Sequence, residues 1–164
     1  MRRVAVGHPL EAQGQPAPVG IDLDGDLPLD GGDVLGARTI ILACGVSWRR
    51  LPVEGIDPLT GKGVTYGAAR SEASNTHGLD VHIVGAGNSA GQAAMNFAKY
   101  AERVVILVRG DGLSATMSQY LIDQIKERPN IQIWTHASVA EVHGEKHLEE
   151  VSVLCSDTNK VERV

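Results

Sequence analysis

A short glycine-rich segment, Val84-Gly85-Ala86-Gly87-Asn88-Ser89-Ala90, constrains the fold of this chain more than any other feature. It follows an apolar run at residues 81–84 that has the length of a buried strand. After it, small and apolar residues recur at helical spacing as far as Ala101, which predicts a helix. A strand that turns sharply through glycine into a helix is typical of the start of a βαβ unit.

The turn also has the residue pattern of a dinucleotide-binding site. Gly85, Gly87 and Ala90 occupy the three small-residue positions of the fingerprint G-x-G-x-x-G/A. Gly85 permits the tight turn, Gly87 lets the backbone approach a pyrophosphate, and Ala90 lets the helix pack closely on the sheet. The first N–H groups of the helix favour an anion, and Asn88 or Ser89 is suited to cap the helix or to contact a phosphate. The other interpretation is a tight strand-to-helix turn that binds nothing.

Further along the chain, strands and helices continue to alternate. Apolar runs at residues 104–108 and 131–134 predict two more strands, and the helical pattern between them ends near Pro129. This order with short connections indicates a parallel sheet. Residues 139–142 and 151–154 are strand-like and predict a hairpin or meander. The predicted fold is therefore α/β, a Rossmann-type three-layer nucleotide-binding domain with a parallel sheet and a β-meander.

The amino-terminal part has a different composition. Residues 1–33 are rich in Gly, Pro and Asp, and their frequent turn signals predict short strands and loops. The first convincing strand is at residues 39–43 and ends at Gly45. A link rich in Pro and Gly follows as far as Gly78, with a short helix expected at residues 68–74.

The residue after the second predicted strand bears on which dinucleotide fits. About 20 residues after the fingerprint, an acidic residue commonly accepts a hydrogen bond from the ribose 2′-hydroxyl of NAD. This chain has Arg109 there, and a guanidinium suits the 2′-phosphate of NADP. Two alternatives stay open: Arg109 is a solvated surface charge, or Asp111 pairs with it or takes the hydroxyl role.

These motifs resemble the thioredoxin-reductase-like branch of the pyridine nucleotide-disulfide oxidoreductases, from about residue 34 onward. Residues 39–45 resemble the strand and A-T-G turn that close the first part of the family's FAD domain, with Cys44 in place of threonine. The fingerprint resembles that of the family's NADPH domain. The resemblance implies that residues 1–50 are the C-terminal part of an incomplete FAD-binding segment, with Gly45 adjoining flavin, and that residues 51–164 are an NAD(P)H-binding Rossmann-type domain.

The function that the resemblance implies is the NADP(H)-binding portion of an FAD-dependent oxidoreductase, which passes hydride from NADPH to flavin. The cofactors would supply this chemistry, so no catalytic residue is expected in the chain. FAD is expected only in a complete protein, and we expect the chain not to be active alone. The alternative is a truncated, non-catalytic dinucleotide-binding or interaction module.

The sequence departs from the family at two places. Residues 107–111 fall on the H-R-R-D stretch that holds the 2′-phosphate, but only Arg109 matches an arginine and Gly110 replaces the second. Gly67 and Arg70 stand at the positions of the redox-active cysteines. Dithiol exchange needs two thiols, so we expect no thioredoxin reduction by that route, and the electron acceptor is unknown.

Composition narrows the remaining classes. The chain has 15 Lys and Arg against 20 Asp and Glu and few aromatic residues, which argues against a nucleic acid partner. No apolar stretch approaches the roughly 20 residues of a membrane-spanning helix, so no membrane partner is expected. Two isolated cysteines, Cys44 and Cys155, indicate a cytoplasmic protein and are interpreted as small buried residues. His136, His143 and His147 lack zinc-site spacing and are interpreted as solvated, so no metal is predicted. A homodimer is one arrangement that the sequence leaves open.

Overall fold

The computed structural model describes residues 3–7, 26–28, 31–36 and 50–164. The chain divides into two compact units, one made of Met1–Pro9 and Arg50–Val164 and the other of Leu10–Arg49. In the smaller unit, β2 (Asp26–Pro28) and β3 (Val34–Gly36) form an antiparallel pair. The strand predicted at residues 39–43 lies outside the described residues.

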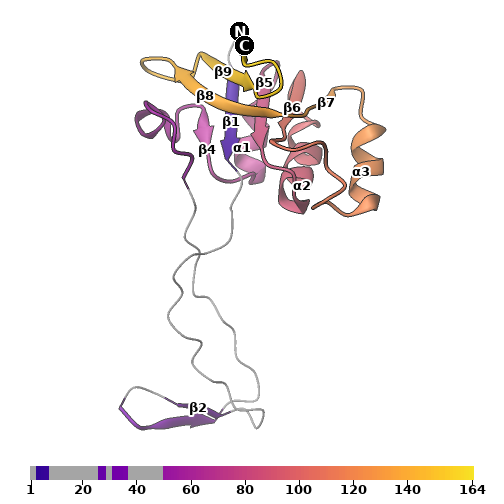
Figure 1. Ribbon diagram of the computed structural model, residues 1–164. Coiled ribbons are helices and arrows are strands. Elements are labelled where there is room, and N and C mark those ends of the chain that lie inside the picture. The colour runs from indigo at the N-terminus through magenta and orange to yellow at the C-terminus, as the bar shows by residue number, and fades with distance from the viewer. Residues whose placement is uncertain (1–2, 8–25, 29–30, 37–49) are drawn as a thin grey trace. The chain divides into compact units, whose positions relative to one another are not determined.

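The larger unit is built on a five-stranded parallel sheet in the order β4-β1-β5-β6-β7 (Figure 1). The strands are β1 (Arg3–Gly7), β4 (Val64–Thr65), β5 (Asp80–Val84), β6 (Arg103–Leu107) and β7 (Ile131–Trp134). The three strands predicted around the glycine turn are confirmed as β5, β6 and β7. The pairing of β1 with β5 was not predicted from the sequence, and it brings Gly7 opposite Val84 at the carboxyl edge of the sheet.

One face of the sheet is covered by helices. They are α1 (Arg70–Ser74), α2 (Asn88–Phe97) and α3 (Gln119–Lys126). Strand side chains alternate between the two faces, so Val81 and Ile83 of β5 pack against the helices together with Phe97, which is fully buried. The helical periodicity of the sequence is confirmed, because the apolar positions form this core.

The other face is covered by an antiparallel meander. In Figure 1, β8 (Ala137–His143) and β9 (Glu150–Cys155) lie across the sheet, and β10 (Lys160–Arg163) pairs with β9. A short 3-10 helix, η1 (Asp57–Leu59), contributes to the same core. Val105 and Leu107 of β6 pack here against Val151 and Val153. Helices, parallel sheet and meander form three layers, which confirms the predicted fold class.

Close packing of α2 on α3 depends on a glycine. A Cβ atom placed on Gly91 would lie 2.5 Å from Cδ2 of Leu121 and 2.9 Å from Sδ of Met117. Both neighbours are buried in the core between the helices and the sheet. The two helices can therefore approach this closely only because position 91 has no side chain.

Candidate functional site

The glycine turn lies at the carboxyl edge of the parallel sheet and has the backbone geometry that the fingerprint requires. Gly85 has φ of 137°, in the region that favours glycine, and its N–H donates to the carbonyl of Leu107 at 3.1 Å. Gly87 is the N-cap residue of α2, and no side chain caps that helix. The first turn of α2 also contains no acidic residue. No side chain therefore occupies the backbone N–H groups of the first turn of α2. These N–H groups and the positive end of the helix dipole are suited to bind an anionic group.

Asn88 connects the turn to the start of α3. Its Oδ1 atom accepts hydrogen bonds from the backbone N–H of Ser118 at 2.8 Å and from the Ser118 hydroxyl at 2.7 Å. The hydroxyl of Thr116 donates to the carbonyl of Ala86 at 2.8 Å. Because Ser118 is the N-cap residue of α3, the amino ends of α2 and α3 meet at the glycine turn.

This arrangement corrects part of the sequence interpretation. Neither Asn88 nor Ser89 caps α2, since the capping oxygen of Asn88 is engaged by Ser118. Both residues are exposed beside the turn, so a phosphate contact through Ser89 or the Asn88 amide group stays a prediction. Thr116 and Ser118 were not predicted from the sequence, because no short motif connects them to the turn.

Arg109 follows β6 at the same edge of the sheet. Its side chain is exposed and makes no ion pair within the described ranges, whereas the preceding Val108 is buried. Asp111 pairs with His136 rather than with Arg109. The structure therefore does not show the alternative in which Asp111 pairs with Arg109. The Arg109 guanidinium is left available to bind a ligand.

His136 lies in the turn after β7, beside the segment that carries Arg109. Its Nε2 atom is 3.2 Å from Oδ1 of Asp111, and its Nδ1 atom is 3.1 Å from Oδ1 of Asp157. Its backbone N–H donates to the carbonyl of Gly110 at 3.2 Å. With 29% of the side chain exposed, the interpretation of His136 as simply solvated is wrong. Its position two residues beyond a parallel strand is the signal that could have identified it.

Two other residues also differ from their sequence interpretation. His143 is half-buried and its Nε2 atom lies 2.8 Å from the Ser152 hydroxyl. Cys155 is half-buried rather than buried, at the start of the turn from β9 to β10. A hydrogen bond from the Thr158 hydroxyl, helped by the backbone N–H groups of Thr158 and Asp157, lowers the pKa of the Cys155 thiol below its usual value.

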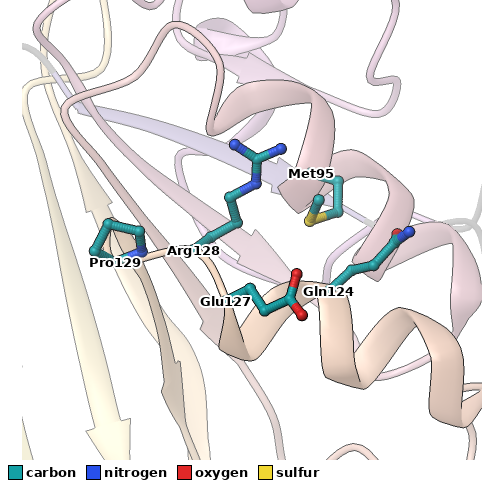
Figure 2. A pocket seen from close by; sticks show the side chains of 5 residues that line it. All are labelled: Met95, Gln124, Glu127, Arg128 and Pro129. Carbon is teal, nitrogen blue, oxygen red and sulfur yellow. The ribbon is translucent and has the colours of Figure 1, made fainter.

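A hollow of about 380 Å³ lies at the opposite end of the helices (Figure 2). It is lined by Met95 near the end of α2, by Gln124 of α3, and by Glu127, Arg128 and Pro129 just beyond α3. The glycine turn is at the other ends of α2 and α3, so this hollow is not the nucleotide site. Arg128 is exposed in this hollow and lies away from the glycine turn, so it is a suitable control position for substitutions of Arg109.

Metal-binding clusters and membrane-spanning helices are both absent from the part of the chain that the structure describes. No group of three or more His, Cys, Asp or Glu side chains suited to a metal ion is found there. None of the helices in these ranges is long and apolar enough to cross a bilayer. Gly45, predicted to adjoin flavin, lies outside the described residues.

The parallel sheet with a glycine turn at its carboxyl edge and an uncapped helix after the turn defines a dinucleotide-binding α/β domain. Comparison with known proteins then identifies the family. The family described as pyridine nucleotide-disulphide oxidoreductase matches residues 17–163, so the chain belongs to it. This confirms the resemblance drawn from the sequence. The family uses flavin and pyridine nucleotides, which supports dinucleotide cofactors for the chain.

Individual relatives agree with this assignment. The F subunit of alkyl hydroperoxide reductase from Staphylococcus aureus is 32% identical over 120 residues, which are 73% of this chain and 23% of the relative. NADH dehydrogenase of Ferdinandcohnia aciditolerans is 28% identical over 139 residues, 85% of this chain and 26% of the relative. The chain thus spans about a quarter of the length of these curated relatives.

Solved structures show the same fold. Thioredoxin reductase from T. acidophilum superposes with a TM-score of 0.67 at 25% identity, covering 85% of this chain and 44% of that one. Thioredoxin reductase from Streptococcus pyogenes gives a TM-score of 0.67 at 24% identity, covering 73% and 39%. The fold of the chain is therefore thioredoxin-reductase-like.

Proposed function

We propose that this chain is the NADP(H)-binding portion of a thioredoxin-reductase-like flavin oxidoreductase, in which hydride passes from NADPH to flavin. The observation that carries the proposal is the glycine turn: Gly85 in a conformation that favours glycine, followed by α2 with no side-chain cap. Arg109, exposed and without an ion pair in the described ranges, supports a phosphorylated ribose.

Each part of the nucleotide has candidate residues. The turn residues would hold the pyrophosphate: Gly85, Ala86, Gly87, Asn88, Ser89 and Ala90. Backbone N–H groups at the start of α2 would donate to its oxygens, and the helix dipole would favour its negative charge. Arg109 would read the 2′-phosphate with charge-assisted hydrogen bonds. Gly45 would adjoin flavin in a complete flavin site.

The bound cofactors would supply the redox chemistry as transfer of a hydride from nicotinamide to flavin. The chain would orient the nucleotide and set the charge around its ribose. On this proposal residues 51–164 are the NAD(P)H-binding domain, whose sheet also includes β1, and the remainder of residues 1–50 belongs to the flavin-binding segment. Gly67 and Arg70 stand at the positions of the cysteine pair in the thioredoxin-reductase-like branch of the family. Electrons would therefore pass from flavin to the acceptor without a dithiol at these positions.

Calorimetric titration of the purified chain with NADPH and NADH tests the binding part of the proposal. Loss of a charge-assisted contact to phosphate is worth about 1.5–3 kcal/mol, so Arg109→Ala should weaken NADPH binding about 10- to 150-fold. NADH binding should not change, because NADH lacks the 2′-phosphate. Arg128→Ala, which removes an exposed arginine at the far end of the helices, is the matched control and should leave both affinities unchanged.

Absence of binding of both nucleotides would refute the proposal. An equal loss of NADPH and NADH affinity in Arg109→Ala would refute the assignment of Arg109 to the 2′-phosphate. The hydride-transfer part is tested by adding FAD and following NADPH-dependent bleaching of the flavin absorbance in the intact protein. No bleaching in a protein that holds both cofactors would contradict it.

A further inference from the structure

We infer that Thr116 and Ser118 are positioning residues for the pyrophosphate of the nucleotide. Their hydrogen bonds engage oxygen atoms of the glycine turn and leave the N–H groups of the turn for the ligand. This inference rests on the proposed function, because it concerns the same turn. It adds two residues at the start of α3, about 30 positions beyond the fingerprint, and neither of them would contact the nucleotide itself.

The contacts between the start of α3 and the glycine turn all have the same polarity. The hydroxyl of Thr116 donates to the carbonyl of Ala86 at 2.8 Å. The backbone N–H and the hydroxyl of Ser118 both donate to Oδ1 of Asn88, at 2.8 Å and 2.7 Å. In each contact the turn supplies the acceptor oxygen, and none of them uses an N–H group of the turn. The turn therefore keeps its donors, while its oxygens at Ala86 and Asn88 are engaged.

Thr116 fixes the orientation of the peptide group between Ala86 and Gly87. A trans peptide is planar, so its C=O and N–H bonds point in opposite directions, and the described residues contain no cis peptide bond. Because the Ala86 carbonyl is held toward Thr116, the Gly87 N–H points away from Thr116. Among the residues that the structure describes, none accepts a hydrogen bond from this N–H. It is thus an oriented donor beside the uncapped start of α2.

Ser118 fixes the side chain of Asn88 in the same sense. A backbone N–H can only donate, so the Asn88 atom that faces the backbone of Ser118 is the amide oxygen. The NH2 group on the other branch of the planar amide therefore points away from Ser118. Asn88 is exposed and is the first residue of α2, so this NH2 group offers donors next to the first N–H groups of the helix.

The engaged oxygens matter because a pyrophosphate is an anion. A carbonyl oxygen that faced it would repel it, whereas successive N–H groups form a concave surface that binds anions. Glycine at position 87 lets the backbone approach the ligand, but it also gives the neighbouring peptide group freedom to rotate. The Thr116 hydroxyl removes that freedom before the nucleotide arrives. Donors that are held in place in advance lower the cost of ordering on binding.

Calorimetric titration with NADPH and NADH tests the role of the Thr116 hydroxyl. Thr116→Val keeps the shape of the side chain without the hydroxyl, and it should weaken both nucleotides about fivefold, the effect of one net hydrogen bond. The ratio of the two affinities should not change, because both nucleotides contain the pyrophosphate. Thr116→Ser retains the hydroxyl and should restore both affinities. Ser118→Ala should have a smaller effect, because the backbone N–H of Ser118 still donates to Asn88.

A spectroscopic measurement follows the donor itself. In ¹H–¹⁵N NMR spectra, the Gly87 amide signal should shift on saturation with NADH in wild type and in Thr116→Ser. The shift should be distinctly smaller in Thr116→Val, because the Gly87 N–H is no longer held toward the ligand. A purely structural role of Thr116 would lower stability without changing this shift.

Thr76→Val is the matched control. The Thr76 hydroxyl also donates to a backbone carbonyl, that of Ala73, at 2.7 Å, and the residue is buried. It precedes β5, whereas the glycine turn follows β5, a strand of five residues and therefore about 17 Å long. This variant should unfold more readily than wild type and bind both nucleotides with wild-type affinity.

The outcomes separate the inference from the function on which it rests. If wild type binds both nucleotides and Thr116→Val binds them equally well, the inference is overturned and the proposed function stands. A loss for NADPH alone, a loss that Thr116→Ser does not reverse, or the same loss in Thr76→Val also overturns it. Binding of neither nucleotide to wild type refutes both. Equal weakening of both nucleotides in Thr116→Val, with wild-type affinities in Thr116→Ser and Thr76→Val, supports the inference.

Discussion

Replacing Gly91 with alanine should destabilise the protein, although the same change usually stabilises a helix. Gly91 lies inside α2, and in an exposed helix interior alanine is favoured over glycine by about 0.8–1 kcal/mol. Here the new methyl group would meet the neighbouring helix. Its Cβ atom would lie 2.5 Å from Cδ2 and 2.9 Å from Cγ of Leu121, and 2.9 Å from Sδ of Met117.

The size of the effect follows from how these neighbours can move. Carbon contacts are optimal at about 3.5–4.0 Å, so each of the three contacts is too short by roughly half an ångström or more. Met117 is flexible at its sulfur and can adjust, but Cγ of Leu121 is a branch point in a side chain that is 2% exposed. Overpacking of this kind costs about 1–3 kcal/mol. The upper half of that range, less the gain in helix propensity, leaves a net destabilisation of about 1–2 kcal/mol.

Urea and thermal unfolding measure the difference directly. For a chain of this size, each kcal/mol should lower Tm by about 2–4 °C. The pair Gln92→Gly and Gln92→Ala, at an exposed neighbouring position of α2, measures helix propensity without packing. In a Leu121→Ala background both Leu121 contacts are removed and only the adjustable sulfur of Met117 remains close, so adding Gly91→Ala should there stabilise the protein by up to about 1 kcal/mol. A Gly91→Ala single variant as stable as wild type would refute the packing argument.

Two further predictions concern contacts around the site. Asn88→Ala removes the oxygen that accepts two hydrogen bonds from Ser118. It should lower the free energy of unfolding by only about 1 kcal/mol, because these contacts are partly hydrated. Ser89→Ala, at an exposed neighbouring position, should change the free energy of unfolding by less than about 0.5 kcal/mol in the same urea titration. Thr158→Val removes the hydroxyl that stabilises the Cys155 thiolate, so the thiol pKa should rise and alkylation of Cys155, followed by peptide mass spectrometry at neutral pH, should slow. Unchanged alkylation across the pH range would show that the Thr158 hydroxyl does not act on the thiolate.

The sequence was most informative where a single segment contains the whole signal. The apolar run of β7 predicted its bounds, Ile131–Trp134, and the pattern of small residues located the turn at Gly85. Both features are local, because strand formation in a buried sheet and a left-handed turn depend on consecutive residues. The antiparallel meander was predicted as far as β9 for the same reason.

Elements that depend on distant partners were not predictable in this way. β10 has four exposed residues and no apolar face, and it is a strand because the hairpin places it beside β9. β1 is a five-residue segment whose parallel neighbours β4 and β5 follow it only after long stretches of chain. Local pattern does not specify such pairing, since strand propensity depends strongly on context.

The same limit applies to the candidate site, and it explains why the surroundings of Arg109 differ from what the motif alone suggested. Asn88 and Ser118 are 30 residues apart and meet only because α3 starts beside the glycine turn. Asp111 was weighed as a partner for Arg109 on the basis of sequence proximity, yet the structure pairs it with His136, which reaches it from beyond the next strand. A parallel sheet brings the ends of β6 and β7 to one edge, so that His136 meets Asp111 there, and Asp157 reaches the same imidazole from the turn between β9 and β10 of the meander. On the proposed function, nucleotide preference would therefore depend on the combined charge of this edge, and Arg109 alone would be an incomplete guide to it.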